Sequence, residues 1–191
     1  MTLTAVLLAG GESRRMGRDK ATIVFRGQPL WQRQLDLLRE LSPEKIFVSA
    51  REEPVWLPIW TELLLDEPPS RGPLSGLTSA LKRMETTHLL ALAVDMPFMT
   101  SEQMRGLWSL ATIGCGVLPM IGDRAEPLAA IYPREAAPHF AAGLAGRDFS
   151  LQRLAGNLAT ANLIQILSVP EKDGHLYRSV NALGDFQGAT V

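Results

Sequence analysis

A continuous apolar run at residues 4–9 ends abruptly at a pair of glycines, Gly10 and Gly11. A run without polar alternation is typical of a strand that is buried on both faces, as in a parallel sheet. We therefore expect residues 4–9 to form the central strand of such a sheet.

The rest of the chain alternates between short apolar runs and stretches with helical spacing. The further strands that we expect are Ile46–Ser49, Leu63–Leu65, Leu89–Val94 and Leu163–Val169, and the helices are a stretch opened by Pro29, Leu74–Met84 and Ser101–Leu110. This alternation predicts right-handed β–α–β crossovers. The runs Gly116–Ile121 and Pro127–Tyr132 flank a Gly-Asp-Arg turn and predict an antiparallel pair added to the sheet. The predicted fold class is α/β: one domain of three layers, Rossmann-like, with a mostly parallel sheet.

Length and charge limit what the chain can do. Its 191 residues suit a single domain, which we expect to span residues 1–191. The 19 Lys and Arg residues almost balance the 20 Asp and Glu residues, so no global basic field attracts nucleic acid or an anionic membrane. A single cysteine, Cys115, excludes an internal disulfide, and no apolar stretch approaches the roughly 20 residues of a membrane span. We expect a cytoplasmic protein that binds neither nucleic acid nor membrane.

The segment 8–20 combines glycines with several basic side chains, a composition that suits a phosphate site. It is not the P-loop of GTPases, because five residues separate Gly11 from Gly17 and Arg18 follows instead of lysine. It also lacks the Gly-x-Gly-x-x-Gly pattern of dinucleotide-binding proteins. A solvated basic loop is the alternative, although the strand directly before the segment argues against it.

Two aspartates follow predicted strands. Ligands of open α/β sheets bind outside the carboxyl ends of the strands, so we expect a site where Gly10-Gly11, Asp66 and Asp95 converge. Asp95 precedes Met96-Pro97 and can hold Mg²⁺, which takes one or two carboxylates together with phosphate oxygens. The alternatives are that Asp95 caps the helix near Ser101, where Ser101 itself is the better cap, and that Asp66 is a solvated loop carboxylate.

The motifs LAGGESRRMGRDK, GQPLW, GPLSG at residues 72–76, Asp95-Met96-Pro97 and Val180-Asn181 resemble those of the molybdenum cofactor guanylyltransferase family. The resemblance extends over nearly the whole chain. It implies a nucleotidyltransferase fold with a nucleotide-binding half at about 1–100 and an acceptor-binding half at about 101–191. The implied reaction is transfer of GMP from GTP to molybdenum-loaded molybdopterin, with Mg²⁺ as cofactor.

The resemblance also implies roles for individual residues. Nucleotide-binding roles fall on Leu8, Ala9, Gly10, Gly11, Lys20, Ser49, Asp66 and Asp95, the metal role on Asp95, and an acceptor-binding role on Asn181. Gly11 favours guanine, and whether Asp66 contacts the base or the ribose stays open. Physical reasoning assigns catalytic roles to Lys20 and Arg15, because cations stabilise the negative charge that spreads over the phosphate oxygens during the reaction.

The chain departs from the family at three positions. Ser49 and Ser179 stand where the family commonly has asparagine, and Glu126 stands where some relatives have histidine. Cytidylyl transfer, sugar-phosphate nucleotidyl transfer and a non-catalytic GTP-binding module therefore stay as alternatives. We expect a monomer, and a protein partner that delivers or inserts the cofactor stays open. The loop Trp56–Trp60 is expected to cover the core or to line an interface.

Overall fold

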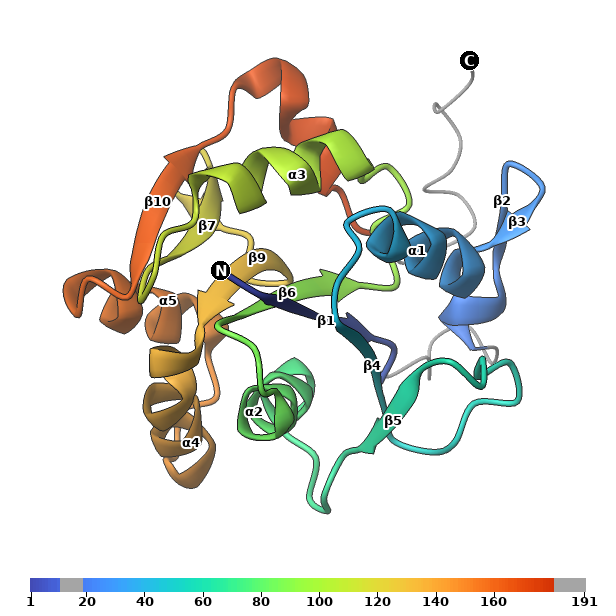
Figure 1. Ribbon diagram of the computed structural model, residues 1–191, viewed down its shortest axis with the longest axis horizontal. Helices are drawn as coiled ribbons and strands as arrows, with labels where there is room; N and C mark the ends of the chain where they lie inside the picture. Colours follow the sequence, from blue (N-terminus) through green and yellow to red (C-terminus); the bar gives the residue numbers. More distant parts are fainter. Residues whose placement is uncertain (11–18, 181–191) are drawn as a thin grey trace.

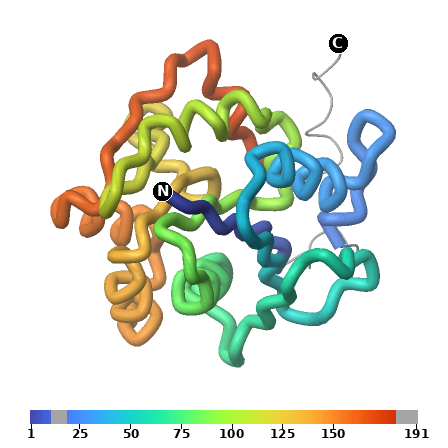
Figure 2. The backbone as a smooth tube through the Cα atoms, viewed as in Figure 1, coloured from blue at the N-terminus to red at the C-terminus, as the bar shows by residue number. Residues whose placement is uncertain are grey.

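The computed structural model describes residues 1–10 and 19–180, and its main feature is an eight-stranded sheet between two layers of helices (Figures 1 and 2). The strands of this sheet are β1 (Leu3–Leu8), β4 (Lys45–Ala50), β5 (Glu62–Leu65), β6 (His88–Ala93), β7 (Gly116–Ile121), β8 (Arg124–Ala125), β9 (Ala129–Pro133) and β10 (Ile164–Ser168). Their order is β10-β7-β9-β6-β1-β4-β5, and β8 pairs with β7. The predicted α/β class with a mostly parallel sheet is confirmed.

The strand β1 lies inside the sheet and is buried along its whole length. It pairs in parallel with β4 on one side and with β6 on the other, so that Val6 is opposite both Phe47 and Ala91. The expectation that this strand is central was wrong by one position, because β6 holds the middle of the strand order. The reason is that the later part of the chain adds β9, β7 and β10 beyond β6, whereas only β4 and β5 lie on the other side of β1.

The antiparallel addition differs in detail from the prediction. The predicted antiparallel pairing of residues 116–121 with 127–132 is confirmed, since β7 is antiparallel to β9, but directly across the turn at Gly122 β7 pairs with the short strand β8. The strand β9 lies between β6 and β7 and is antiparallel to both. Gly122 has φ = 60°, a left-handed conformation that a residue with a side chain rarely adopts.

Helices cover both faces of the sheet. One face carries α1 (Leu30–Arg39) and α3 (Ser101–Leu110) with the 3₁₀ helix η4 (Glu171–Tyr177), and the other carries α2 (Pro73–Arg83), α4 (Ala137–Ala145) and α5 (Leu151–Thr160). The short elements are η2 (Lys20–Thr22), η3 (Arg134–Ala136) and the hairpin of β2 (Val24–Phe25) with β3 (Gln28–Pro29). The sequence analysis missed α4 and α5, although Ser150 caps α5 and its leucines have helical spacing.

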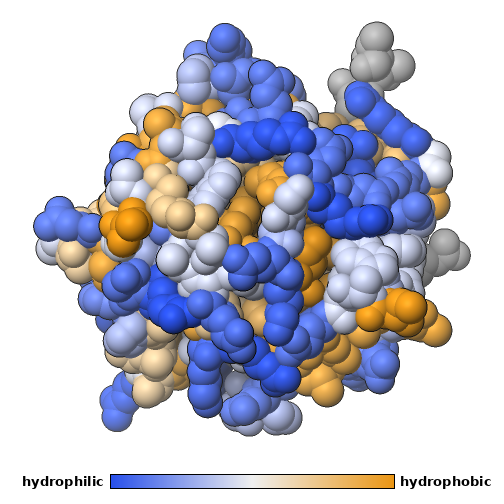
Figure 3. All heavy atoms as spheres, viewed as in Figure 1, coloured by the Kyte–Doolittle hydropathy of each residue, from blue (hydrophilic) through white to orange (hydrophobic). Residues whose placement is uncertain are grey.

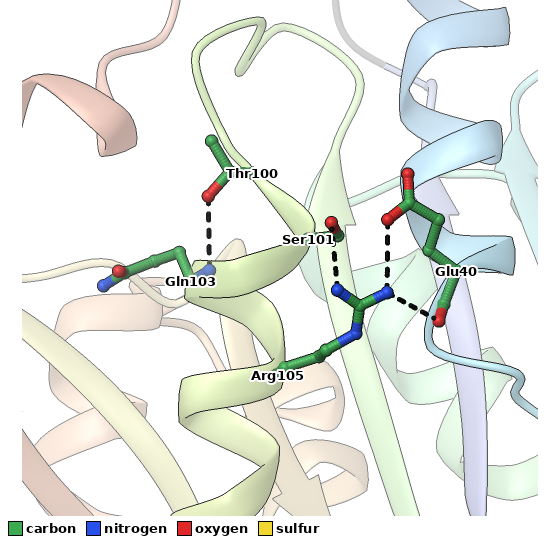
Figure 4. A network of polar contacts seen from close by, with 5 residues as sticks. All are labelled: Glu40, Thr100, Ser101, Gln103 and Arg105. Atoms are coloured by element: carbon green, nitrogen blue, oxygen red, sulfur yellow. Dashed lines mark hydrogen bonds and ion pairs between the residues drawn. The ribbon is translucent and has the colours of Figure 1, made fainter.

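The helices α1 and α3 are tied together at one end (Figure 4). The Arg105 guanidinium of α3 donates to the Glu40 carbonyl at 3.1 Å and to its carboxylate at 3.2 Å, at the end of α1. The cap of α3 is Thr100, whose hydroxyl accepts from the Gln103 amide at 3.2 Å. The expectation that Ser101 is the cap was wrong, because Ser101 already lies in the helix and accepts from Arg105. These contacts fix the two helices that border the carboxyl end of β6.

Figure 3 shows a face on which hydrophilic side chains surround smaller apolar clusters. No helix in the described part of the chain has both the length and the apolar character of a membrane span.

Candidate functional site

The strand order reverses between β1 and β6, since the chain continues from β1 towards β4 and from β6 towards the opposite edge. Parallel pairing extends just beyond the ends of these strands. The Ala9 amide donates to the Ser49 carbonyl at 2.8 Å, and the Val94 amide donates to the Leu8 carbonyl at 3.1 Å. The two loops that leave β1 and β6 therefore start side by side, at the place where ligands bind in sheets of this kind.

One cavity opens at this point, and seven of the residues predicted from the sequence line it: Leu8, Ala9, Gly10, Lys20, Ser49, Asp66 and Asp95. The rest of the lining comes mainly from the start of α2 and the end of β6. The predicted positions Gly11, Arg15 and Asn181 lie outside the described residues. The roles of all these residues stay predictions, but the three strand ends do meet at one cavity.

A lysine and an aspartate face each other in this cavity. The Lys20 ammonium lies 3.4 Å from Oδ2 of Asp95, with 17% and 23% of the two side chains exposed. Burial raises the pKa of Asp95, and the charge of Lys20 partly opposes that shift. Asp19 positions Lys20 by capping η2, because its carboxylate accepts from the Ala21 amide at 3.0 Å. The arrangement offers one cation and one anion to a ligand that carries both phosphates and a metal ion.

Three contacts hold the turn that presents Asp95. From α1, the Gln34 side-chain amide donates to the Met96 carbonyl at 2.6 Å, and Arg33 Nε donates to the Pro97 carbonyl at 2.8 Å. The Val180 amide donates to the Asp95 carbonyl at 2.8 Å, so the end of the described chain returns to this turn. Because Thr100 caps α3, the alternative that Asp95 is a helix cap is not supported.

Asp66 is held by two hydroxyls. Ser49 donates to its Oδ1 at 3.2 Å and Ser70 donates to its Oδ2 at 2.7 Å. Gly10 lies against the same carboxylate, since a Cβ there would be 3.5 Å from Oδ2. Each oxygen keeps lone pairs for further donors. Asp66 is therefore an oriented acceptor rather than a freely solvated loop carboxylate. Ser70 is a member of this group that sequence reasoning missed.

The start of α2 comes close to the sheet beside Asp66. Gly72 precedes the helix with φ = 64°, and the hydroxyl of Ser70 accepts from its amide at 3.1 Å. A Cβ on Gly76 would come within 2.2 Å of the Ser49 hydroxyl and 2.9 Å of Leu8. Gly76 thus allows the helix to pack directly on β1 and β4, whereas Gly72 allows the left-handed turn before the helix.

A second cavity of about 580 Å³ adjoins the first and shares Pro73, Asp95 and Leu128 with it. Its other walls carry the charged side chains Arg124, Glu126 and Arg178 and the aromatic side chains Phe149 and Tyr177. Gln103 of α3 donates to the Tyr177 hydroxyl at 2.8 Å and so holds that wall in place. Sequence reasoning did not predict this cavity, because its walls come from five separate segments.

The described residues contain no group of three or more His, Cys, Asp or Glu side chains that could hold a metal ion by themselves. A metal that binds mainly through phosphate oxygens and water needs only one or two carboxylates. Asp95, a carboxylate with limited exposure at the junction of the two cavities, fits that requirement.

Comparison with known proteins identifies one family. Residues 5–161 match the family model of the MobA-like NTP transferase domain. The chain is 36% identical over 174 residues to a protein of Opitutus terrae named probable molybdenum cofactor guanylyltransferase, covering 90% of this chain and 86% of the relative.

Solved structures share the fold. One is the molybdopterin-guanine dinucleotide biosynthesis protein A of Archaeoglobus fulgidus, with a TM-score of 0.71 and 21% identity over 97% of this chain and 95% of that one. Another is a Mycobacterium tuberculosis protein crystallised in complex with manganese, with a TM-score of 0.64 and 15% identity over 88% of this chain and 89% of that one. At these identities the likeness concerns the fold alone.

Proposed function

This chain belongs to the family of MobA-like NTP transferase domains and is a nucleotidyltransferase, and from this premise we propose that it transfers GMP from GTP to molybdenum-loaded molybdopterin. The products are the guanine dinucleotide form of the cofactor and pyrophosphate. The name of the Opitutus terrae relative supports this choice of nucleotide and acceptor.

The observation that carries the proposal is the position of Asp95 between two cavities. The cavity lined by Leu8, Gly10 and Lys20 takes the nucleotide, and the cavity of about 580 Å³ takes the acceptor. A transferase needs both substrates in contact at the reacting atoms, and holding them so contributes much of the rate enhancement. We therefore propose a nucleotide-binding half at about 1–100 and an acceptor-binding half at about 101–191, which includes Asn181.

In the proposed reaction an oxygen of the acceptor's terminal phosphate attacks the α-phosphorus of GTP. The bond from the α-phosphorus to the bridging oxygen breaks, and pyrophosphate leaves with the electron pair. Lys20, with Arg15, neutralises the charge that builds up on the phosphate oxygens. No side-chain base is required, because the attacking phosphate is already an anion.

Asp95 is the residue that would hold the divalent cation, which we assign as Mg²⁺. When bound, this ion supplies positive charge to the triphosphate and the leaving pyrophosphate. The ion pair with Lys20 holds the carboxylate in the cavity, and the charge of the lysine opposes the rise in the Asp95 pKa that burial causes. We propose that the enzyme works as a cytoplasmic monomer.

The test is pyrophosphate release from GTP and from CTP in the presence of Mg²⁺ and molybdenum-loaded molybdopterin. We expect release with GTP and its loss in Asp95→Ala. Glu102→Ala, an exposed acidic position on α3, is the matched control and should keep full activity. Preference for CTP would move the protein to cytidylyl transfer, and no release with either nucleotide would contradict this choice of acceptor.

A further inference from the structure

The second cavity contains a carboxylate, that of Glu126, without a hydrogen-bond partner in the described part of the chain. Glu126 is half-buried in the wall, directly after the strand β8. Within residues 1–10 and 19–180, no hydrogen bond or salt bridge reaches its carboxylate, although the charge of Arg124 acts on it. Its backbone amide donates to the Pro119 carbonyl at 2.9 Å. A half-buried carboxylate keeps part of its hydration, so a ligand that displaces this water has to supply hydrogen-bond donors in its place.

The charges around the cavity limit what Glu126 can bind. Arg124 and Arg178 line the same space and are exposed, which suits the anionic end of an acceptor. Glu126 would repel a phosphate, and Asp95, the other carboxylate of the wall, already pairs with Lys20. Glu126 must therefore face a part of the acceptor that donates hydrogen bonds.

The aromatic side chains in the lining suit a ligand with a flat ring. Phe149 and Tyr177 are both part of the lining, and the Arg71 guanidinium lies 4.3 Å from the centre of the Phe149 ring, where it fixes one of the two aromatic walls. A carboxylate has two oxygens in one plane and accepts best from two adjacent N–H groups of a planar donor. A 2-amino-4-oxopyrimidine ring presents such a pair, its ring N–H and its amino group.

We propose that Glu126 determines acceptor specificity by accepting hydrogen bonds from the N–H edge of a 2-amino-4-oxopyrimidine ring, while Arg124 and Arg178 hold the acceptor's anionic end. This inference rests on the proposed function for the identity of the acceptor, whose pterin carries that edge. The inference gives Glu126 a role in recognising the acceptor. It also explains why a carboxylate and two arginines line the same cavity.

The experiment measures binding of pterin-6-carboxylate and of lumazine-6-carboxylate, in which an oxo group replaces the 2-amino group, by ring fluorescence. Wild-type protein should bind the pterin more tightly than the lumazine. Glu126→Gln keeps the side-chain shape but removes the charge, and it should weaken pterin binding by about tenfold, the effect of losing a hydrogen bond to a charged group. Lumazine binding should change little. Glu135→Gln, at an exposed position on η3, is the control and should leave both affinities unchanged.

Equal losses for the two compounds in Glu126→Gln, unchanged pterin binding, or no pterin binding by the wild type would each overturn the inference. Steady-state kinetics of pyrophosphate release test the role of Glu126 separately from the proposed function. Glu126→Gln should raise KM for the acceptor and leave KM for GTP unchanged, and a rise in the GTP value alone would assign Glu126 to the nucleotide instead. If the wild type binds pterin selectively but releases no pyrophosphate, the proposed function fails while the role of Glu126 stands.

Discussion

Asp66 is the residue whose surroundings best define a ligand contact. Ser49 and Ser70 each donate to a different oxygen, which fixes the plane of the carboxylate and leaves its remaining lone pairs directed into the cavity. Oriented in this way, the carboxylate can accept from the N1–H and amino groups of guanine or from the ribose hydroxyls. In either case we expect Asp66 to bind the nucleotide away from the α-phosphorus, because Asp66 follows β5 and Asp95 follows β6, on opposite sides of β1.

We predict that Asp66→Asn raises KM for GTP by about tenfold and changes kcat little, because one charged acceptor is lost away from the reacting atoms. Measurements with ITP, which lacks the amino group, and with 2′-deoxy-GTP identify the partner. If the mutant and the wild type have the same KM for one of these analogues, the group that this analogue lacks is the group that Asp66 binds. A large fall in kcat at unchanged KM would contradict a purely binding role.

Glu126 also predicts a pH-dependent cost to stability. Burial raises its pKa above that of an ordinary glutamate, the negative charge of Asp95 adds to the rise, and Arg124 opposes it. A carboxyl whose pKa is higher in the folded state favours folding when protonated, so its contribution is lost as the pH rises through the folded-state pKa. The penalty is then fully present at pH values above the folded-state pKa.

Replacing this carboxylate with a neutral amide removes the penalty. Glu126→Gln should melt about 1–2 °C higher than wild type near neutral pH, a small gain because the side chain is only half-buried and solvent screens it. The gain should vanish at a pH below the ordinary glutamate pKa, where the wild-type side chain is also neutral. Thermal melting curves of both proteins at the two pH values test this prediction. A gain in melting temperature that is larger in acid would contradict a raised pKa of Glu126 in the folded state.

At the scale of elements, the close packing of α2 on β1 and β4 depends on Gly76. A methyl group there would meet the Ser49 hydroxyl at 2.2 Å, so either the helix or Ser49 has to move. We predict that Gly76→Ala lowers the free energy of unfolding by about 1–3 kcal/mol, as overpacking does. It should also raise KM for GTP, since Ser49 orients Asp66. Urea denaturation and steady-state kinetics measure the two effects.

Gly106→Ala supplies the matched control, because this glycine lies inside α3 and no atom is within 4 Å of its would-be Cβ. The same substitution should there stabilise the protein by up to about 1 kcal/mol, the difference in helix propensity between the two residues. If both variants were stabilised, the packing argument for Gly76 would be wrong.

A second link between elements joins the β4–β5 connection to η2. Trp56 Nε1 donates to Oδ2 of Asp19 at 3.0 Å, and Trp56 stacks on Trp31 with ring centroids 5.2 Å apart. Asp19 caps the helix that begins with Lys20, so this contact steadies the segment that carries the lysine. We predict that Asp19→Asn, which keeps an acceptor for the cap but not for Trp56, lowers kcat by about three- to tenfold with little change in KM.

Circular dichroism reports on the Trp31–Trp56 stack independently of activity, because the electronic transitions of stacked indole rings couple to each other. The coupling between Trp31 and Trp56 should weaken in Asp19→Asn and stay intact in Trp60→Phe, whose ring is exposed and lies over Arg39. Unchanged coupling together with reduced kcat would mean that Asp19 acts on Lys20 without the tryptophans.

The sequence predicted most strands to within two residues, because buried runs such as 4–9 and 89–94 end sharply at Gly or Asp. It also predicted that Asp66 and Asp95 share a cavity, since that follows from the carboxyl ends of parallel strands. The position of β9 between β6 and β7 was not predictable, because pairing between distant segments leaves no local signal. The Ser70–Asp66 and Trp56–Asp19 contacts were missed for the same reason: each depends on how a loop folds back.

At the scale of the whole molecule, the two proposed halves are joined by one sheet. The pairing of β6 with β9 runs from His88–Pro133 to Leu92–Ala129 and crosses the boundary near residue 100. Both clusters of core side chains also draw on the two halves, for example Leu90 with Ile131 and Leu89 with Tyr132. Because both clusters of buried side chains span the two proposed halves, the halves are not separate folding units.

We therefore predict one cooperative unfolding transition for residues 1–191. Trp31, Trp56 and Trp60 report on the first half and Trp108 on the second, so the fluorescence of Trp108→Phe and far-UV circular dichroism should give the same midpoint. GTP with Mg²⁺ at about 100 times its dissociation constant adds about 2.7 kcal/mol and should raise both midpoints together by roughly 5–10 °C. Chelating the metal should remove most of that rise. Two separate midpoints, or a rise confined to the fluorescence signal, would mean that the halves unfold independently and that the cavity at Asp95 lies between two domains.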